Sequence, residues 1–225
     1  KKGHKLALVI YPYEPGKANY SQDYQITLEN ASVSAEIPVD KIPAVPALPF
    51  TDVPADTELY AAVKWAYFSA PQITVGVTET TFAPANTCTR AEIVTFLYRA
   101  AGSPEVKADT VNPFTDVSKD SVYYNAILWA VENGITKGTT DTTFDPNAVC
   151  TRGQIVTFLF RASGDEKVAT GTNFADVASG SYCADAVAWA VANKVANGFA
   201  DGTFRPEATC TRGQAVTFIY RALAE

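Results

Sequence analysis

The chain has 225 residues, of which 47% are hydrophobic, with 18 Lys and Arg against 24 Asp and Glu. This apolar content is enough for a folded core and excludes a disordered segment. The net charge of -6 excludes a general electrostatic attraction to nucleic acid or anionic lipid, so any anionic partner has to be bound by a local positive site.

The first 49 residues differ in character from the rest of the chain. Residues 6–13 and 24–28 have the composition of strands, and four prolines follow between positions 38 and 49. We therefore expect residues 1–49 to be the tail of a preceding β-rich region with a proline-rich linker. No run reaches the roughly 18 apolar residues of a membrane span, so no membrane insertion is expected. A start at Lys1 and the absence of Met suggest a piece of a longer protein.

From residue 50 onwards, one ordered pattern recurs three times. Each copy opens with Phe-x-Asp-Val, and the three openings lie 64 and then 60 residues apart. A Trp-Ala pair, a glycine, Thr-Phe-x-Pro, Cys-Thr-Arg and a final Arg-Ala pair follow in the same order. Such self-similarity is typical of tandem structural repeats, which we expect at 50–102, 114–164 and 174–225 with polar connectors between them. The repeated aspartates, tryptophans and glycines are Asp52, Asp116, Asp176, Trp65, Trp129, Trp189, Gly76, Gly138 and Gly198.

Each repeat predicts two helices. A hydroxyl side chain can cap the start of the first one, and the candidate caps are Thr57, Ser121 and Ser181. The second helix has a stronger signal, because a threonine is followed three residues later by Glu or Gln, which is the capping-box pattern. These threonines are Thr89, Thr151 and Thr211.

The four cysteines show no CxxC spacing suited to zinc. Three of them, Cys88, Cys150 and Cys210, directly precede the predicted capping threonines, where an apolar side chain can pack onto the first turn. We interpret these three as buried structural thiols rather than metal ligands or redox groups. Pairing of Cys183 with one of them stays open at this stage.

Together, these motifs resemble the S-layer homology family. The resemblance covers residues 50–225 and includes Gly-x-x-Asp-Gly-Thr-Phe-x-Pro from Gly198 to Pro206 and Thr-Arg-Ala-Glu from Thr89. It implies a mainly α fold in which three helix-loop-helix repeats are arranged with pseudo-threefold symmetry. Each repeat would give one helix to a central three-helix bundle, with ligand grooves between neighbouring repeats and a short β-like extension before the first.

The resemblance also implies a function. It is the non-covalent anchoring of a secreted surface protein to the bacterial cell wall, through an acidic secondary cell-wall polysaccharide that often bears pyruvylated amino sugar. We accordingly expect a module outside the cell at the cell wall, monomeric, and without a cofactor. The alternative is a protein–protein interaction or self-assembly module at the cell surface.

Arg90, Arg152 and Arg212 occupy the first position of a predicted helix, where the helix dipole disfavours a cation by about 0.3–1 kcal/mol. We interpret them as ligand-binding residues that act with free backbone N–H groups on a carboxylate or phosphate. The alternative is that they pair with Asp52, Asp116 and Asp176.

Two further features bear on these arginines. Late in the same helices, Arg99, Arg161 and Arg221 complement the dipole, so a structural role is expected for them. Gln154 and Gln214 replace a glutamate after the arginine, which is expected to leave that arginine freer to bind an anion.

The other repeated residues have both a structural and a ligand-binding interpretation. The aspartates could bind sugar hydroxyls, but an aspartate before a helix more often organises a turn. The tryptophans could stack on sugars, although on an amphipathic helix a core position is favoured. The glycines are expected to let the backbone turn and approach a ligand or a neighbour closely.

Catalysis is not expected from this sequence. Its carboxylates form no identifiable acid/base pair, and His4 is the single histidine, which leaves no Ser-His-Asp or Cys-His set. Residues 141–145 do not fit the spacing of an EF-hand, so a turn is expected there instead of a calcium site. No metal site is expected.

Overall fold

The computed structural model describes residues 25–26, 35–36, 46–165, 171 and 174–224. The chain divides into two compact units, Lys1–Ala47 and Leu48–Glu225. In the first unit, β1 (Gln25–Ile26) pairs antiparallel with β2 (Ala35–Glu36), and Gln25 lies opposite Glu36. The strand β1 falls within the predicted strand at 24–28, whereas the predicted strand at 6–13 lies outside the described residues.

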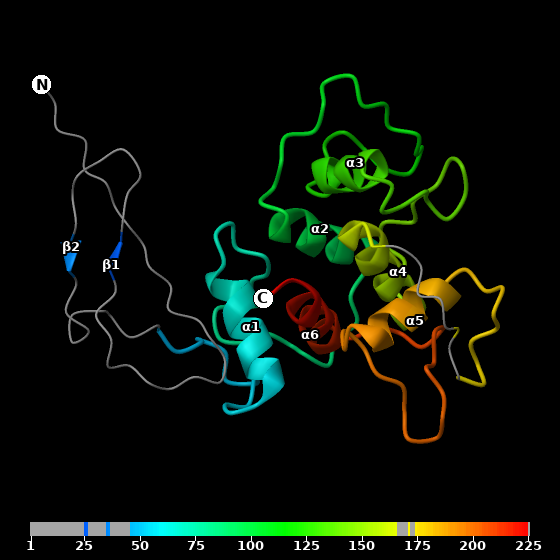
Figure 1. Cartoon of the computed structure of the whole chain (residues 1–225). Coiled ribbons are helices and arrows are strands. Elements are labelled where there is room, and N and C mark those ends of the chain that lie inside the picture. Colours follow the sequence, from blue (N-terminus) through cyan, green and yellow to red (C-terminus); the bar gives the residue numbers. More distant parts are fainter. Residues whose placement is uncertain (1–24, 27–34, 37–45, 166–170, 172–173, 225) are drawn as a thin grey trace, which may run out of the picture. The chain divides into compact units, whose positions relative to one another are not determined.

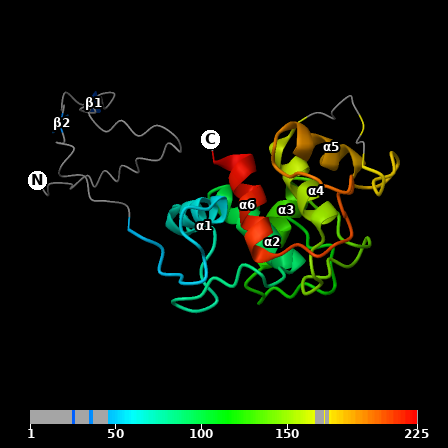
Figure 2. The same ribbon diagram turned by 90° about the horizontal axis from the view of Figure 1, so that it is seen from below.

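The second unit contains six described helices, two from each repeat. The inner helices are α2 (Arg90–Ala100), α4 (Arg152–Ser163) and α6 (Arg212–Leu223). They contact one another and form the central bundle, as Figures 1 and 2 show. The outer helices are α1 (Glu58–Phe68), α3 (Tyr124–Glu132) and α5 (Ala184–Ala192). The predicted mainly α fold, with one helix per repeat in a central three-helix bundle, is confirmed. None of these six helices is long and apolar enough to span a membrane.

Each outer helix packs on the inner helix of the preceding repeat. Helix α3 packs on α2, α5 on α4 and, closing the ring, α1 on α6. Each contact pairs a repeated tryptophan with another aromatic ring at 5.7–5.8 Å between ring centres: Trp65 with Tyr220, Trp129 with Tyr98, and Trp189 with Phe160. The bidentate pair of Arg221 with Glu58, at 2.6 Å for both bonds, also joins the last helix to the first. The repeats therefore depend on one another for burial of their outer helices.

The inner helices begin where the capping-box pattern predicts. The side chains of Thr89, Thr151 and Thr211 each accept a hydrogen bond from the backbone three residues on, and the Glu or Gln there accepts one in return. Among the outer helices, the Thr57 cap is confirmed by its bond from the Tyr60 N–H at 3.1 Å.

The predicted caps Ser121 and Ser181 are wrong, because the chain makes one more turn before each helix begins. The Tyr124 N–H donates to the carbonyl of Ser121, and the Ala184 N–H donates to that of Ser181. The helices α3 and α5 start at Tyr124 and Ala184, after Tyr123 and Cys183.

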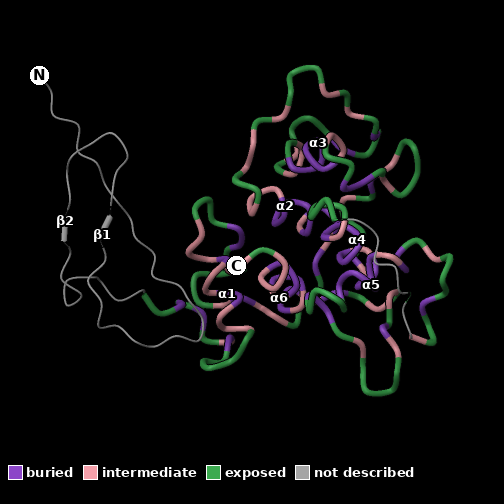
Figure 3. Tube along the Cα trace, viewed as in Figure 1, coloured by how far each residue is buried: buried purple, intermediate pink, exposed green. Residues whose placement is uncertain are grey.

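The backbones of three cysteines form a closed ring of hydrogen bonds. The Cys88 N–H donates to Cys210, Cys150 to Cys88 and Cys210 to Cys150, over 2.8–3.2 Å. All four cysteines are free and buried, which answers the open question about Cys183. Burial raises the pKa of Cys88 and Cys210 to about 12 and also raises the pKa of Cys150. The described residues contain no His, Cys, Asp and Glu cluster that could hold a metal. The three cysteines of this hydrogen-bonded ring are thus part of the core. Figure 3 shows buried segments along the helices.

Candidate functional site

The three predicted arginines lie at three equivalent junctions between repeats. At each junction the first turn of an inner helix meets the Thr-Phe-x-Pro segment of the next repeat, and the third repeat meets the first. We name them the Arg90, Arg152 and Arg212 junctions. Contacts between distant parts of the sequence build all three, since Arg90 and its partner Phe144 are 54 positions apart.

Each arginine is buried and donates to the backbone of the next repeat. Only 4%, 4% and 7% of Arg90, Arg152 and Arg212 is exposed. Their Nε atoms donate to the carbonyl oxygens of Phe144, Phe204 and Phe82, respectively, at 2.9–3.1 Å. The Nη2 atoms of Arg152 and Arg212 donate at 3.0 Å to Asn197 and Val75. In the described part of the chain, Arg90 Nη2 is a buried nitrogen with no partner.

Aromatic rings surround these guanidinium groups. The Cζ atom lies 4.8 Å from the ring centre of Phe144 for Arg90, of Phe204 for Arg152 and of Phe82 for Arg212. Such a cation–π contact stabilises the charge inside the protein. Burial still lowers the pKa of Arg90 and Arg152 below the usual arginine value, but arginine stays protonated at neutral pH.

The prediction that free backbone N–H groups flank the arginines is wrong. The Arg90 and Ala91 N–H groups donate to the carbonyls of Ala148 and Pro146 in the next repeat, at 2.9 and 3.1 Å. The other two junctions repeat this pattern with Ala208 and Pro206, and with Asn86 and Pro84. The third N–H of each helix is bonded to the capping threonine. The neighbouring repeat, rather than a ligand, therefore satisfies the helix starts.

The repeated aspartates bind backbone instead of the arginines. Asp52 accepts from the N–H groups of Phe82 and Ala83 at 2.8 and 2.7 Å. Asp116 binds Phe144 and Asp145, and Asp176 binds Phe204 and Arg205, in the same way. Among the described residues, none of these carboxylates forms an ion pair with an arginine of the junctions. Each aspartate holds the segment whose phenylalanine carbonyl accepts from the arginine.

The repeated glycines touch a phenylalanine of their own repeat. A Cβ at Gly76, Gly138 or Gly198 would lie 2.4, 2.5 or 2.0 Å from the ring of Phe50, Phe114 or Phe174. The close approach expected at these glycines is thus made to a neighbour inside the repeat. Trp129 and Trp189 are 8% and 4% exposed, and Trp65 is half-buried.

The late arginines also bond to backbone. The Nη1 atoms of Arg99, Arg161 and Arg221 donate at 3.1–3.3 Å to the carbonyl oxygens of Ile73, Ile135 and Val195. These bonds connect the end of each inner helix to the loop of its own repeat, in keeping with the structural role expected for them.

The repeat sequences match the model of the S-layer homology domain at residues 49–94, 113–156 and 173–216. These matches cover more than half of the chain. The chain belongs to the S-layer homology (SLH) family. The three matched segments contain the opening Phe-x-Asp-Val, the outer helix, the junction loop and the start of the inner helix of every repeat.

The relatives of this SLH chain include a surface-layer protein, an endoglucanase and an anchoring protein. It is 37% identical over 44% of its length to the surface-layer 125 kDa protein of Lysinibacillus sphaericus, covering 8% of that protein. It is 29% identical over 77% of its length to an endoglucanase of a Bacillus strain, covering 18% of it. A cellulosome-anchoring protein of Acetivibrio thermocellus is 27% identical over 63% of the chain, which covers 33% of that protein.

The chain spans a third or less of each of these relatives. The activities that their names denote are therefore those of much longer proteins. The family and the surface relatives confirm the predicted localisation outside the cell at the cell surface.

The SLH junctions differ in the residue that faces each arginine. Glu92 Oε1 lies 4.0 Å from Nη1 of Arg212, an arginine of another repeat. Gln154 and Gln214 occupy the same helix position as Glu92. By the equivalence of the junctions, they face Arg90 and Arg152. We expected Gln154 and Gln214 to remove a negative charge from beside the arginine of their own helix. By the same equivalence, they remove it from beside the arginine of the preceding repeat.

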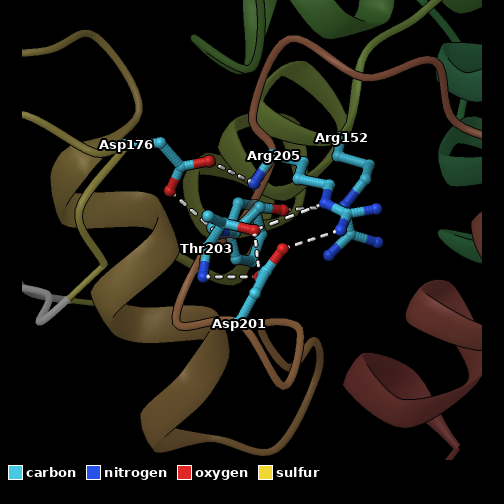
Figure 4. Close-up of polar contacts among 6 residues, drawn as sticks. Arg152, Asp176, Asp201, Thr203 and Arg205 are labelled. Carbon is cyan, nitrogen blue, oxygen red and sulfur yellow. Dashed lines mark hydrogen bonds and ion pairs between the residues drawn. The ribbon is translucent and has the colours of Figure 1, made fainter.

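Sequence reasoning missed two residues of SLH repeat 3, Phe199 and Arg205. Arg205 pairs with Asp201 at 2.9 Å, and its Cζ lies 4.0 Å from the centre of the Phe199 ring. Figure 4 shows the bonds that Arg205 makes with Asp176, Thr203 and Asp201. Their signal in the sequence is a departure from the repeat, because Thr139 and Asp145, or Val77 and Ala83, stand at these positions in the other repeats.

The aspartates of the SLH repeats predict a loss of stability in acid. Burial alone would raise the pKa of Asp176, but bonds from the Phe204 and Arg205 N–H groups outweigh it and hold the pKa below its usual value. A carboxylate with a lowered pKa stabilises the fold above the unfolded pKa of about 4, and this contribution is lost as the pH falls through the folded pKa. Asp176→Asn should lower the free energy of unfolding at pH 7 by about 1 kcal/mol, since the exposed carboxylate is screened.

Urea unfolding between pH 7 and pH 2.5 measures this effect. The difference between the wild type and Asp176→Asn should shrink below about pH 4, because protonation removes the same acceptor. Asp120→Asn, at an exposed position, is the matched control and should follow the wild type. A constant difference at every pH would contradict the assigned role of Asp176.

Proposed function

We propose that this SLH chain anchors the protein to which it belongs to the bacterial cell wall, by binding acidic groups of a wall polysaccharide at the junctions between repeats. Membership of the SLH family and the surface-layer and cellulosome-anchoring relatives support this function. Within the proposal, Arg90, Arg152 and Arg212 carry the positive charge. The aspartates and glycines shape the loop segments of the junctions, and the tryptophans pack the outer helices onto the inner ones.

The observation that carries the proposal is buried positive charge without a carboxylate. Within the described ranges, no carboxylate lies at ion-pair distance from Arg90 or Arg152, although the chain as a whole has a net charge of -6. A buried ion is costly unless it is paired, and backbone carbonyls offset this cost only in part. An acid group of the polymer, such as the carboxylate of a pyruvyl ketal, supplies the missing charge in this proposal.

Sedimentation with cell-wall sacculi tests the function. The chain should pellet with intact sacculi and stay in solution with sacculi whose attached polysaccharide has been chemically removed. Soluble polysaccharide released from the same walls should compete, whereas the same material with its carboxylates reduced to alcohols should compete poorly. This chemical control leaves the protein unchanged, which matters because the three arginines also bond to backbone.

Two results would argue against the proposal. Equal pelleting with stripped and intact sacculi would place the partner elsewhere in the wall. No pelleting, together with concentration-dependent assembly in sedimentation velocity, would favour the self-assembly alternative.

A further inference from the structure

The three junctions are unequal at two loop positions. The first follows the repeated glycine, and the second lies between Phe and Pro of the Thr-Phe-x-Pro segment. At the Arg152 junction these positions hold Phe199 and Arg205. At the Arg90 junction they hold Thr139 and Asp145, and at the Arg212 junction Val77 and Ala83. An aromatic ring and a second cation thus occur together at one junction.

The two cations of the Arg152 junction share the Phe199 ring. The Cζ atoms of Arg152 and Arg205 lie 4.9 and 4.0 Å from its centre. Phe199 is 36% exposed, and the Arg205 side chain is 50% exposed, whereas Arg152 is buried. A solvent-exposed guanidinium and a buried one therefore share one ring. Burial lowers the pKa of Arg152, and the nearby charge of Arg205 lowers it further.

Their charges are only partly balanced. Arg205 is paired with Asp201, whose side chain is 52% exposed. Arg152 has no carboxylate at ion-pair distance in the described residues, and Asp176 is occupied by backbone N–H groups. The charges of Arg152 and Arg205 repel each other, and an anion bound at this junction relieves that repulsion.

The other two junctions are less favourable to an anion. At the Arg212 junction the carboxylate of Glu92 already faces the arginine at 4.0 Å. At the Arg90 junction the position of Arg205 is taken by Asp145, whose negative charge acts on Arg90. The repeated aspartates are common to all three junctions and do not distinguish them.

We propose that the Arg152 junction is the main anion site of the chain and that Arg205 and Phe199 are its specificity-determining residues, binding an acidic sugar unit of the wall polysaccharide. This inference rests on the proposed function and deepens it. Arg205 offers its guanidinium to the carboxylate of the sugar, with a geometry that suits bidentate binding. The exposed part of Phe199 contacts the apolar face of the sugar ring. Asp201 competes with the carboxylate for Arg205.

Binding of soluble wall polysaccharide, measured by isothermal titration calorimetry, tests the site. Arg205→Gln should weaken binding about tenfold, the scale of one lost hydrogen bond between charged groups. Lys119→Gln removes the same charge from an exposed position in another repeat and should bind like the wild type. Polysaccharide with reduced carboxylates should bind equally weakly to the wild type and to Arg205→Gln.

A second variant is expected to act in the opposite direction. Asp201→Asn removes the competing carboxylate, which is ionised because bonds from Thr203 and Arg205 lower the pKa of Asp201 to about 2. This variant should bind the polysaccharide several-fold more tightly. Circular dichroism and thermal unfolding should show that both variants fold like the wild type, since the altered pair is exposed.

The outcomes separate the inference from the function. If the wild type binds walls and Arg205→Gln binds equally well, the site is not at the Arg152 junction, but the anchoring function stands. If Asp201→Asn weakens binding as much as Arg205→Gln does, the sugar needs the Arg205–Asp201 pair intact. Asp201 would then not compete with the sugar carboxylate for Arg205. If the wild type does not bind the polysaccharide, the proposed function fails first.

Discussion

Replacing Gly138 by alanine is expected to lower the free energy of unfolding by about 3 kcal/mol, through crowding and backbone strain together. A Cβ at this position would lie 2.5 Å from the Phe114 ring and 2.5 Å from the carbonyl oxygens of Thr140 and Thr143. Two of these three atoms are backbone, so rotation of a side chain cannot relieve the contact. Gly138 also has a φ of 85°, which alanine adopts only with strain.

Urea unfolding followed by circular dichroism measures the loss, and Gly180→Ala is the matched control. No heavy atom lies within 4 Å of a Cβ built on Gly180, and its φ is not in the left-handed region. The control should change stability by less than about 0.5 kcal/mol. If Gly138→Ala unfolds like the wild type but loses wall binding, the glycine would serve a ligand rather than the packing of Phe114.

Local signals in the sequence predicted the inner helices well. A capping box is formed by residues three positions apart, so its pattern can be recognised without knowledge of the fold. Thr89, Thr151 and Thr211 cap their helices as predicted. The caps of the outer helices were harder, because Ser121 and Ser181 instead accept hydrogen bonds in an added turn, which a single hydroxyl residue does not reveal.

Partners distant in the sequence could not be predicted. The dipole argument identified Arg90, Arg152 and Arg212 as unusual, but their acceptors are carbonyl oxygens of another repeat. Backbone carbonyls occur at every residue, so no sequence pattern marks the one that a buried arginine will meet. The same holds for Glu92, which faces Arg212 although 120 positions separate them in the numbering.

Arg152→Met is the variant with the second large expected effect. It removes the donors to the carbonyl oxygens of Phe204 and Asn197, at 3.0 Å each, while keeping an apolar stem among the surrounding rings. Hydrogen bonds to a charged group are worth about 1.5–3 kcal/mol each, and part of this is offset because no charge has to be buried any longer. We therefore expect the free energy of unfolding to fall by about 3 kcal/mol, measured by urea unfolding.

The same substitution at Arg205 separates the two kinds of arginine at this junction. The Arg205 pair with Asp201 is exposed, so Arg205→Met should cost no more than about 1 kcal/mol. Wall binding should nevertheless fall in Arg205→Met, whereas Arg152→Met should lose stability as well. If Arg152→Met keeps wild-type stability and loses only wall binding, the bonds to Phe204 and Asn197 do not hold the repeats together. Arg152 would then be buried only to bind the ligand, and its contacts with the neighbouring rings would offset the free-energy cost of burying the charge.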